Sequence, residues 1–240
     1  MPIAPVRTLL HPPKKWALYF DGVDDYVEVA NDPSLFSSKM TIIAWVKSLE
    51  TRNERIVISH GLYNLYGWYW WMPLGDIWGF AYNKDGDSST SVLFPYAEFA
   101  GSWKMLSTAV DNDNLKVYAY INDSLVKTAG MAFAMDPPNC PLRIGRYSGN
   151  GYSWRGHIAS VMLYNRLLNS SEIQHNYLNP MSPILDGLVL WLKMEEGSGT
   201  TVHDYSGYGN DGTIYGASWT EITHDPVRTL SPVRILSPVR

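Results

Sequence analysis

One aromatic run in this chain has the chemistry to hold a ligand. Its members are Tyr66, Trp68, Tyr69, Trp70, Trp71 and Trp78. Side chains alternate along a β-strand, so Trp68 and Trp70 would face one way while Tyr69 and Trp71 would face the other. One of these faces must be core. The other can stack against flat sugar faces and hydrogen-bond through its polar tips, or it can be packed within the protein as well.

Acidic turns form a second group of candidates, because calcium prefers oxygen ligands. The first turn holds Asp21, Asp24 and Asp25, which we take as the candidate metal ligands. Further acidic or amide side chains occur in two later loops, at Asp85, Asp87, Asp204, Asn210 and Asp211. The alternative is that all of these are solvated turn residues.

Catalytic patterns are missing from the sequence. Glycoside hydrolysis needs two carboxylates that flank the scissile bond, but there is no alternating Glu-x-Asp-x-Glu motif. Glu195 and Glu196 are adjacent and would point to opposite faces of a strand. No Ser-His-Asp order or His-Glu-x-x-His motif occurs, and the six histidines are scattered. We therefore do not expect an enzyme.

Both ends of the chain carry the same short motif. Residues 5–10 are PVRTLL, residues 226–235 are PVRTLSPVRI, and residues 237–240 repeat SPVR. A tandem array or a polymerising subunit would show such a repeat, whereas the alternative is a flexible Pro-rich linker. The candidate assembly residues are Pro5, Val6, Arg7, Pro226, Val227, Arg228, Pro232, Val233 and Arg234.

Composition limits the classes of partner. The chain has 240 residues, 45% of them hydrophobic, and a formal net charge of −4. This charge argues against a general nucleic-acid binder, which needs a basic surface. The single Cys140 excludes an intrachain disulfide. No apolar run approaches the ~20 residues of a membrane span, and the first residues do not form a signal peptide.

The elements that must position these residues are mostly short strands separated by turns. We predict a hairpin over 17–29, turning at Asp21 and Gly22, and one helix over 167–177 capped by Ser170 or Ser171. One helical turn is expected at 34–36. Further strands are expected at 40–47, 55–59, 63–71, 76–82, 103–110, 115–122, 125–129, 142–145 and 156–165. This pattern is typical of a β-sandwich or jelly roll.

Several of these segments resemble a known family in their order and spacing. They are the Asp21-Gly22 turn with its acidic pair and Tyr-Val strand, the Trp45 strand, the 103–122 hairpin, the Leu-Arg-Ile-Gly at 142–145, and the Gly-x-Ile strand with the helix after it. Together they resemble the laminin-G-like, concanavalin A-like domains. The resemblance implies an antiparallel jelly-roll sandwich. It also implies a structural calcium site, although Ala159 and Ser160 stand where many relatives carry acidic ligands.

The segment 186–219 stands after the helix, whereas the family normally has such a segment before the first hairpin. It could fold back onto its own domain as a circular permutation. It could instead complete the sheet of a neighbouring molecule by strand exchange, or be an unrelated pair of strands.

These observations lead to one architecture and two functions. We expect an arm over 1–15, a jelly-roll domain over 16–222 and a second arm over 223–240. The first function is a non-catalytic binding or adhesion module for glycan or a protein surface. The alternative is a structural subunit of a virion, filament or surface array that self-associates through its arms or by strand exchange. The resemblance implies an extracellular, cell-surface or virion location, and calcium is the only cofactor that we consider.

Overall fold

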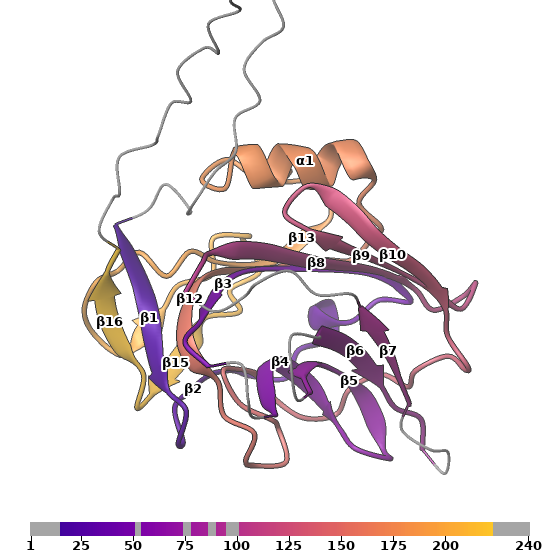
Figure 1. The fold of residues 1–240 in the computed structure, drawn as a ribbon, viewed down its shortest axis with the longest axis horizontal. Coiled ribbons are helices and arrows are strands. Elements are labelled where there is room, and N and C mark those ends of the chain that lie inside the picture. The colour runs from indigo at the N-terminus through magenta and orange to yellow at the C-terminus, as the bar shows by residue number, and fades with distance from the viewer. Residues whose placement is uncertain (1–14, 51–53, 74–77, 86–89, 95–100, 223–240) are drawn as a thin grey trace, which may run out of the picture.

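The computed structural model describes residues 15–50, 54–73, 78–85, 90–94 and 101–222. Over these residues the chain forms two antiparallel sheets of eight strands each, which face one another as a jelly-roll sandwich with one α-helix (Figure 1). The predicted all-β fold is therefore confirmed. The Pro-Val-Arg residues at both ends lie outside the described residues.

The first sheet has the order β10-β9-β8-β3-β12-β1-β16. Strand β12 is long enough to pair with β1 along its first half and with β13 along its second half. The strands of this sheet are β1 (Trp16–Asp21), β3 (Lys39–Ser48), β8 (Lys104–Asp111), β9 (Lys116–Ile121), β10 (Ser124–Gly130), β12 (Arg155–Tyr164), β13 (Leu188–Leu192) and β16 (Ser218–Glu221).

The second sheet has the order β14-β15-β2-β11-β4-β5-β6-β7. Its strands are β2 (Tyr26–Val29), β4 (Arg55–Leu62), β5 (Tyr66–Met72), β6 (Trp78–Tyr82), β7 (Thr90–Phe94), β11 (Leu142–Ile144), β14 (Thr201–Val202) and β15 (Gly212–Tyr215). The sequence pattern did not predict β7. A short 3-10 helix, η1 (Pro33–Leu35), follows β2 where one helical turn was expected.

The predicted hairpin over 17–29 is wrong, although both of its strands exist. Strand β1 pairs with β12 and β16 in the first sheet, whereas β2 pairs with β11 and β15 in the second. The turn therefore crosses from one sheet to the other. A local Asp-Gly signal indicates that the chain turns, but it does not say which strands pair afterwards.

The segment 186–219 folds back onto the sheets of its own chain. Strand β13 pairs with β12, β15 pairs with β2, and β16 pairs with β1. The described part of the chain begins and ends at adjacent points, because the backbone N–H of Ile222 donates to the Lys15 carbonyl at 2.7 Å. Of the three arrangements considered for this segment, the structure shows the one in which the chain completes its own sandwich.

The main core lies between the two sheets, and a second apolar layer covers the outer face of the first sheet. Strand β3 contributes to both layers: Ile42 and Ala44 face the main core, whereas Ile43 and Trp45 face outward. Burial on both faces explains why this strand is a nearly continuous apolar run without alternation.

Helix α1 (Ser170–Leu178) lies over the outer face of the first sheet (Figure 1). Its Ile173 and Tyr177 are buried there, and the Tyr177 ring stacks on Trp45 with 5.6 Å between centroids. The N-cap is Asn169, whereas Ser170 or Ser171 was predicted. The helix is too short and too polar to span a bilayer, and no other α-helix occurs among the described residues.

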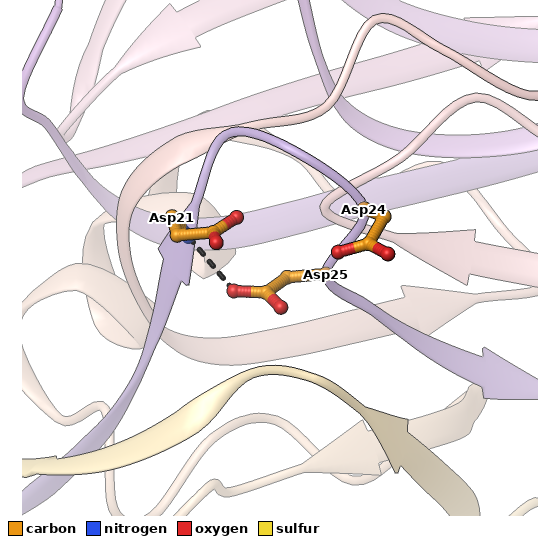
Figure 2. A group of neighbouring side chains, drawn as sticks. All are labelled: Asp21, Asp24 and Asp25. Atoms are coloured by element: carbon orange, nitrogen blue, oxygen red, sulfur yellow. Dashed lines mark hydrogen bonds between the residues drawn. The ribbon is translucent and has the colours of Figure 1, made fainter.

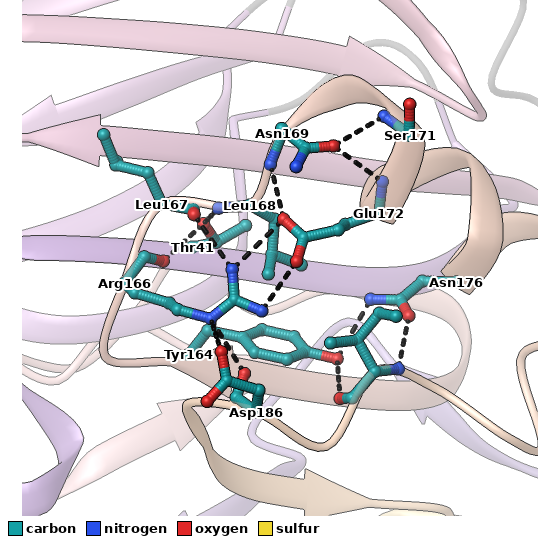
Figure 3. Close-up of polar contacts among 11 residues, drawn as sticks. Thr41, Tyr164, Arg166, Leu167, Leu168, Asn169, Ser171, Glu172, Asn176 and Asp186 are labelled. Carbon is teal, nitrogen blue, oxygen red and sulfur yellow. Dashed lines mark hydrogen bonds and ion pairs between the residues drawn. The ribbon is translucent and has the colours of Figure 1, made fainter.

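Polar contacts fasten the start of this helix to the sheet (Figure 3). The Asn169 carboxamide oxygen accepts from the backbone N–H of Glu172 at 3.1 Å, and the Glu172 carboxylate accepts from the backbone N–H of Asn169 at 2.9 Å. This reciprocal pair is a capping box. The same carboxylate takes two hydrogen bonds from the Arg166 guanidinium, at 2.7 and 3.1 Å. These contacts fix the orientation of the helix above the outward-facing aromatic residues.

Candidate functional site

The outer face of the second sheet contains a cavity of about 560 Å³, within the usual range for small-ligand sites. Neither helix of the described residues covers this face (Figure 1). The described residues that line the cavity come from β4 to β7 and three loops; they are Glu54, Arg55, Ile56, Tyr63, Tyr69, Trp71, Ala81, Thr90, Ser91, Tyr147 and Tyr152. Aromatic side chains make up nearly half of the set.

The cavity exists because small residues lie beside large ones on this face. Register places Tyr69 opposite Ala81, and Ala81 opposite Ser91, on successive strands. Trp71 lies opposite Gly79 in the next row. A Cβ atom at residue 79 would lie only 2.8 Å from the indole Nε1 of Trp71, so glycine lets the indole lie flat against the sheet. The small side chains therefore form the floor and the rings form the walls.

The loop that supplies the remaining wall is held against β4 at two points. The backbone N–H of Ser148 donates to Ser59 Oγ at 2.8 Å, and the backbone N–H of Ile56 donates to the Tyr152 carbonyl at 2.8 Å. Tyr147 and Tyr152 stand on this loop, with their ring centroids 6.3 Å apart. The wall is thus formed before any ligand arrives, which lowers the entropy cost of binding.

Tyr147 links this loop to the strand below it. Its ring meets Tyr69 edge-on with centroids 5.3 Å apart, and its phenol oxygen accepts a hydrogen bond from the backbone N–H of Tyr63. Burial raises the pKa of this phenol above its usual range. The group therefore stays protonated at neutral pH, and a phenol that accepts one bond still has its own hydrogen to donate.

The six predicted aromatic candidates divide into three sets. Tyr69 and Trp71 line the cavity, whereas Tyr66 donates its hydroxyl hydrogen to the Asn139 carbonyl and does not line it. The remaining three lie in the main core and have no surface for a ligand, which corrects their assignment: Trp68, Trp70 and Trp78. Trp70 donates its indole hydrogen to Thr108 across the core at 2.9 Å. The alternation within β5 was predicted, and the fold decides which face is core.

Several lining residues that the sequence pattern missed lie outside the aromatic run and its strands. Tyr147 and Tyr152 belong to a Gly-, Ser- and Asn-rich loop between β11 and β12, and Glu54 and Arg55 precede or begin β4. Tyrosines in a small-residue loop are typical of recognition surfaces. That signal was present in the sequence, but nothing local connected this loop with β5.

The three predicted metal ligands do come together in the turn between β1 and β2 (Figure 2). One carboxylate oxygen from each of Asp21, Asp24 and Asp25 lies within 4.8 Å of the others. Asp25 is nearly buried and also accepts from the backbone N–H of Asp21 at 2.8 Å. Burial, helped by the two neighbouring carboxylates, raises the pKa of Asp25. A hard divalent cation would relieve this repulsion, so the donor set fits calcium.

The other acidic candidates have structural roles or lie elsewhere. Asp204 accepts from the backbone N–H groups of Trp191 and Asn210, at 2.9 and 3.0 Å, and Asp211 accepts from that of Asp204 at 2.7 Å. Asp85 donates its backbone N–H to Asp136, and Asp87 lies outside the described residues. Ala159 and Ser160 are both buried within β12.

The lining combines aromatic rings with hydroxyl groups. Glu54 is the single carboxylate among its described lining residues, whereas glycoside hydrolysis uses a pair. Ring faces can stack on a sugar, while phenol and hydroxyl groups can exchange hydrogen bonds with it.

Comparison with known proteins gives a family and several similar folds. Residues 21–174 match the model of the Laminin_G_3 family, described as the concanavalin A-like lectin/glucanases superfamily. No curated protein matches the chain. A candidate carbohydrate-binding protein from Bacteroides ovatus is similar in structure, with a TM-score of 0.70 and 16% identity over 88% of this chain. The chain spans 61% of that protein's length.

Two further solved structures share the fold at lower similarity. The SAP-like pentraxin of Limulus polyphemus has a TM-score of 0.54 and 14% identity, covering 68% of this chain and 82% of its own. The CBM40 of the Ruminococcus gnavus IT-sialidase, bound to α2,3-sialyllactose, has a TM-score of 0.51 and 14% identity, covering 65% of this chain and 95% of its own. At such identities the likeness concerns the fold alone.

Proposed function

The chain belongs to the concanavalin A-like lectin/glucanase superfamily, and from this premise we propose that it is a non-catalytic, lectin-like module that binds glycan. The cavity on the outer face of the second sheet is the proposed binding site. The observation that carries this proposal is the set of aromatic walls around a floor of small residues, on a face that neither described helix covers.

The proposed contacts follow from the side chains. Trp71 and Tyr69 would stack on a sugar ring, because a ring's apolar face matches an aromatic face. Tyr147, Thr90 and Ser91 would exchange hydrogen bonds with sugar hydroxyls. The similar structures that are named for carbohydrate binding or are bound to a glycan favour glycan over a protein surface as the ligand.

Filling the cavity tests the proposal without removing any contact. Ser91 lines the cavity from an exposed position on β7, so a Ser91→Phe ring can occupy the space while the fold persists. The control is Thr213→Phe, an exposed position on β15 of the same sheet. We expect Ser91→Phe to abolish binding on a glycan array and Thr213→Phe to leave it unchanged. Equal binding by both variants would contradict the site.

A structural role remains the second candidate, favoured by one observation. The hydrogen bond between Ile222 and Lys15 means that the two Pro-Val-Arg segments depart from adjacent points of the domain. Two copies of one motif, joined to the domain at neighbouring residues, could engage a neighbouring molecule. Gel filtration of the full chain beside a chain lacking 1–15 and 223–240 tests this idea, and equal elution as monomers would contradict it.

Two smaller proposals follow from the family. The turn carboxylates Asp21, Asp24 and Asp25 would hold one structural calcium ion. An extracellular, cell-surface or virion location would suit a glycan-binding module, and a surface location would suit adhesion.

A further inference from the structure

The charges at the cavity lie together at one end, where β4 begins. Arg55 and Glu54 are the two charged residues among the described lining residues. The Arg55 guanidinium is already engaged, because its Nη2 lies 2.7 Å from Glu50 Oε2 and both side chains are only 18% exposed. A close Arg–carboxylate pair shielded from water is stronger than one on the open surface.

A second arginine lies close to the same glutamate. Arg155 Nη1 lies 4.0 Å from the same Glu50 oxygen, and its side chain is half exposed. Arg55 and Arg155 thus share Glu50, and Glu54 adds a second carboxylate next to Arg55 in the chain, so the formal charges of these four described residues cancel. Among the described residues at this end of the cavity, no cation is left over to neutralise an acidic ligand.

An acidic sugar would meet two costs here. Its carboxylate would have to displace Glu50 from Arg55 or share that guanidinium, and it would add a third negative charge beside Glu50 and Glu54. Like charges at short range, in a partly desolvated site, disfavour binding. An uncharged sugar meets neither cost, because its hydroxyls can donate to Glu54 and accept from the remaining Arg55 donors.

We infer that the cavity takes an uncharged saccharide and discriminates against sialylated or otherwise acidic glycans. The inference rests on the proposed function, and it adds the class of ligand. It differs from what the sialyllactose-bound relative would suggest, because the paired state of Arg55 and the presence of Glu54 are properties of this chain.

Matched pairs of glycans test the inference. The probes are an array of neutral glycans with their sialylated counterparts, followed by calorimetry with lactose and α2,3-sialyllactose and with the best pair from the array. We expect the acidic member of each pair to bind at least about tenfold more weakly, which corresponds to about 1.4 kcal/mol. Binding of the neutral member should change little with added salt, because no ion pair forms with the ligand.

The Glu54→Gln variant provides the decisive comparison. Removing this carboxylate should narrow the difference in affinity between neutral and acidic glycans, chiefly because acidic glycans bind more tightly to the variant. The control is Glu221→Gln, which removes the same charge from an exposed position at the far edge of the first sheet and should preserve the difference. Unchanged urea midpoints would show that both variants fold.

The outcomes separate the two proposals. Equal or tighter binding of acidic glycans, blocked by Ser91→Phe, would overturn the charge inference and leave the proposed site intact. The same discrimination in Glu54→Gln as in the unmodified chain would also overturn it. Absence of binding to every glycan would overturn the proposed function and this inference together.

Discussion

The two outer faces of the sandwich carry similar side chains but differ in what covers them. On the first sheet, Trp45 and Tyr164 point outward but are buried beneath helix α1 and the segment after it. On the second sheet, Tyr69 and Trp71 also point outward, but neither helix of the described residues covers them and small residues open a cavity beside them. Whether an aromatic residue on an outer face is buried in the core or lines a cavity therefore depends on what covers it.

The sharpest way to break this comparison is to remove one tryptophan from each face. Trp45 is fully buried and stacks on Tyr177, so Trp45→Ala should destabilise the fold by about 3–5 kcal/mol, as for a core tryptophan. Trp71→Ala should cost far less stability, because one side of the ring faces the cavity. Urea denaturation of both variants measures the difference, and equal losses would refute the distinction between covered and open faces.

The next largest effect concerns a histidine buried on the core face of the second sheet. His60 on β4 is buried next to Trp68, and burial lowers its pKa from 6.5 to about 4. The unfolded chain takes up a proton below pH 6.5 and the folded chain does not, so the stability present above pH 6.5 is lost as the pH falls toward 4. The loss should reach about 3 kcal/mol.

A pH series of urea unfolding curves measures this loss, with His60→Gln as the comparison. The variant cannot take up that proton, so its stability should fall less between pH 6.5 and 4. Parallel pH profiles for the two proteins would show that His60 is not buried in its neutral form.

Weakening the N-cap of helix α1 should have a smaller effect on stability. Asn169 caps helix α1, and Asn169→Ala should destabilise the domain by about 1 kcal/mol. The hydroxyl of Ser171 takes no part in the capping box, so Ser171→Ala is the control and should be nearly neutral. Glycan binding should be unchanged in both, because the helix covers the opposite sheet. A loss of binding in Asn169→Ala would mean that the two faces are coupled.

The smallest effect concerns the turn that joins the two sheets. If Asp21, Asp24 and Asp25 hold calcium, CaCl₂ at a concentration near its dissociation constant should raise the melting temperature by about 1–2 °C. Asp24→Asn should lose most of that response, because one ligand charge and its repulsion of Asp25 are gone. MgCl₂ serves as the ion control, since the smaller ion demands stricter octahedral geometry. The same calcium response in both proteins would rule out the site.

Much of the fold was readable from local patterns. The alternation in β5 separated Trp68 and Trp70 from Tyr69 and Trp71, and the β8–β9 hairpin pairs across the predicted turn. The cavity was only half predicted, because Tyr147 and Tyr152 line it from a loop about eighty positions beyond Trp71 in the chain. Spacing along one strand carries no information about such a contact.

The sequence by itself determined the strand-rich pattern, the family and the acidic turn, because these follow from residue types within short windows. The tertiary structure decided which strands pair, so that β1 and β2 belong to different sheets and the late segment 186–219 completes both of them. It also decided that Arg55 is bound to Glu50 before any ligand arrives. Pairing, coverage and charge balance depend on residues distant in sequence, and only the folded chain brings them together.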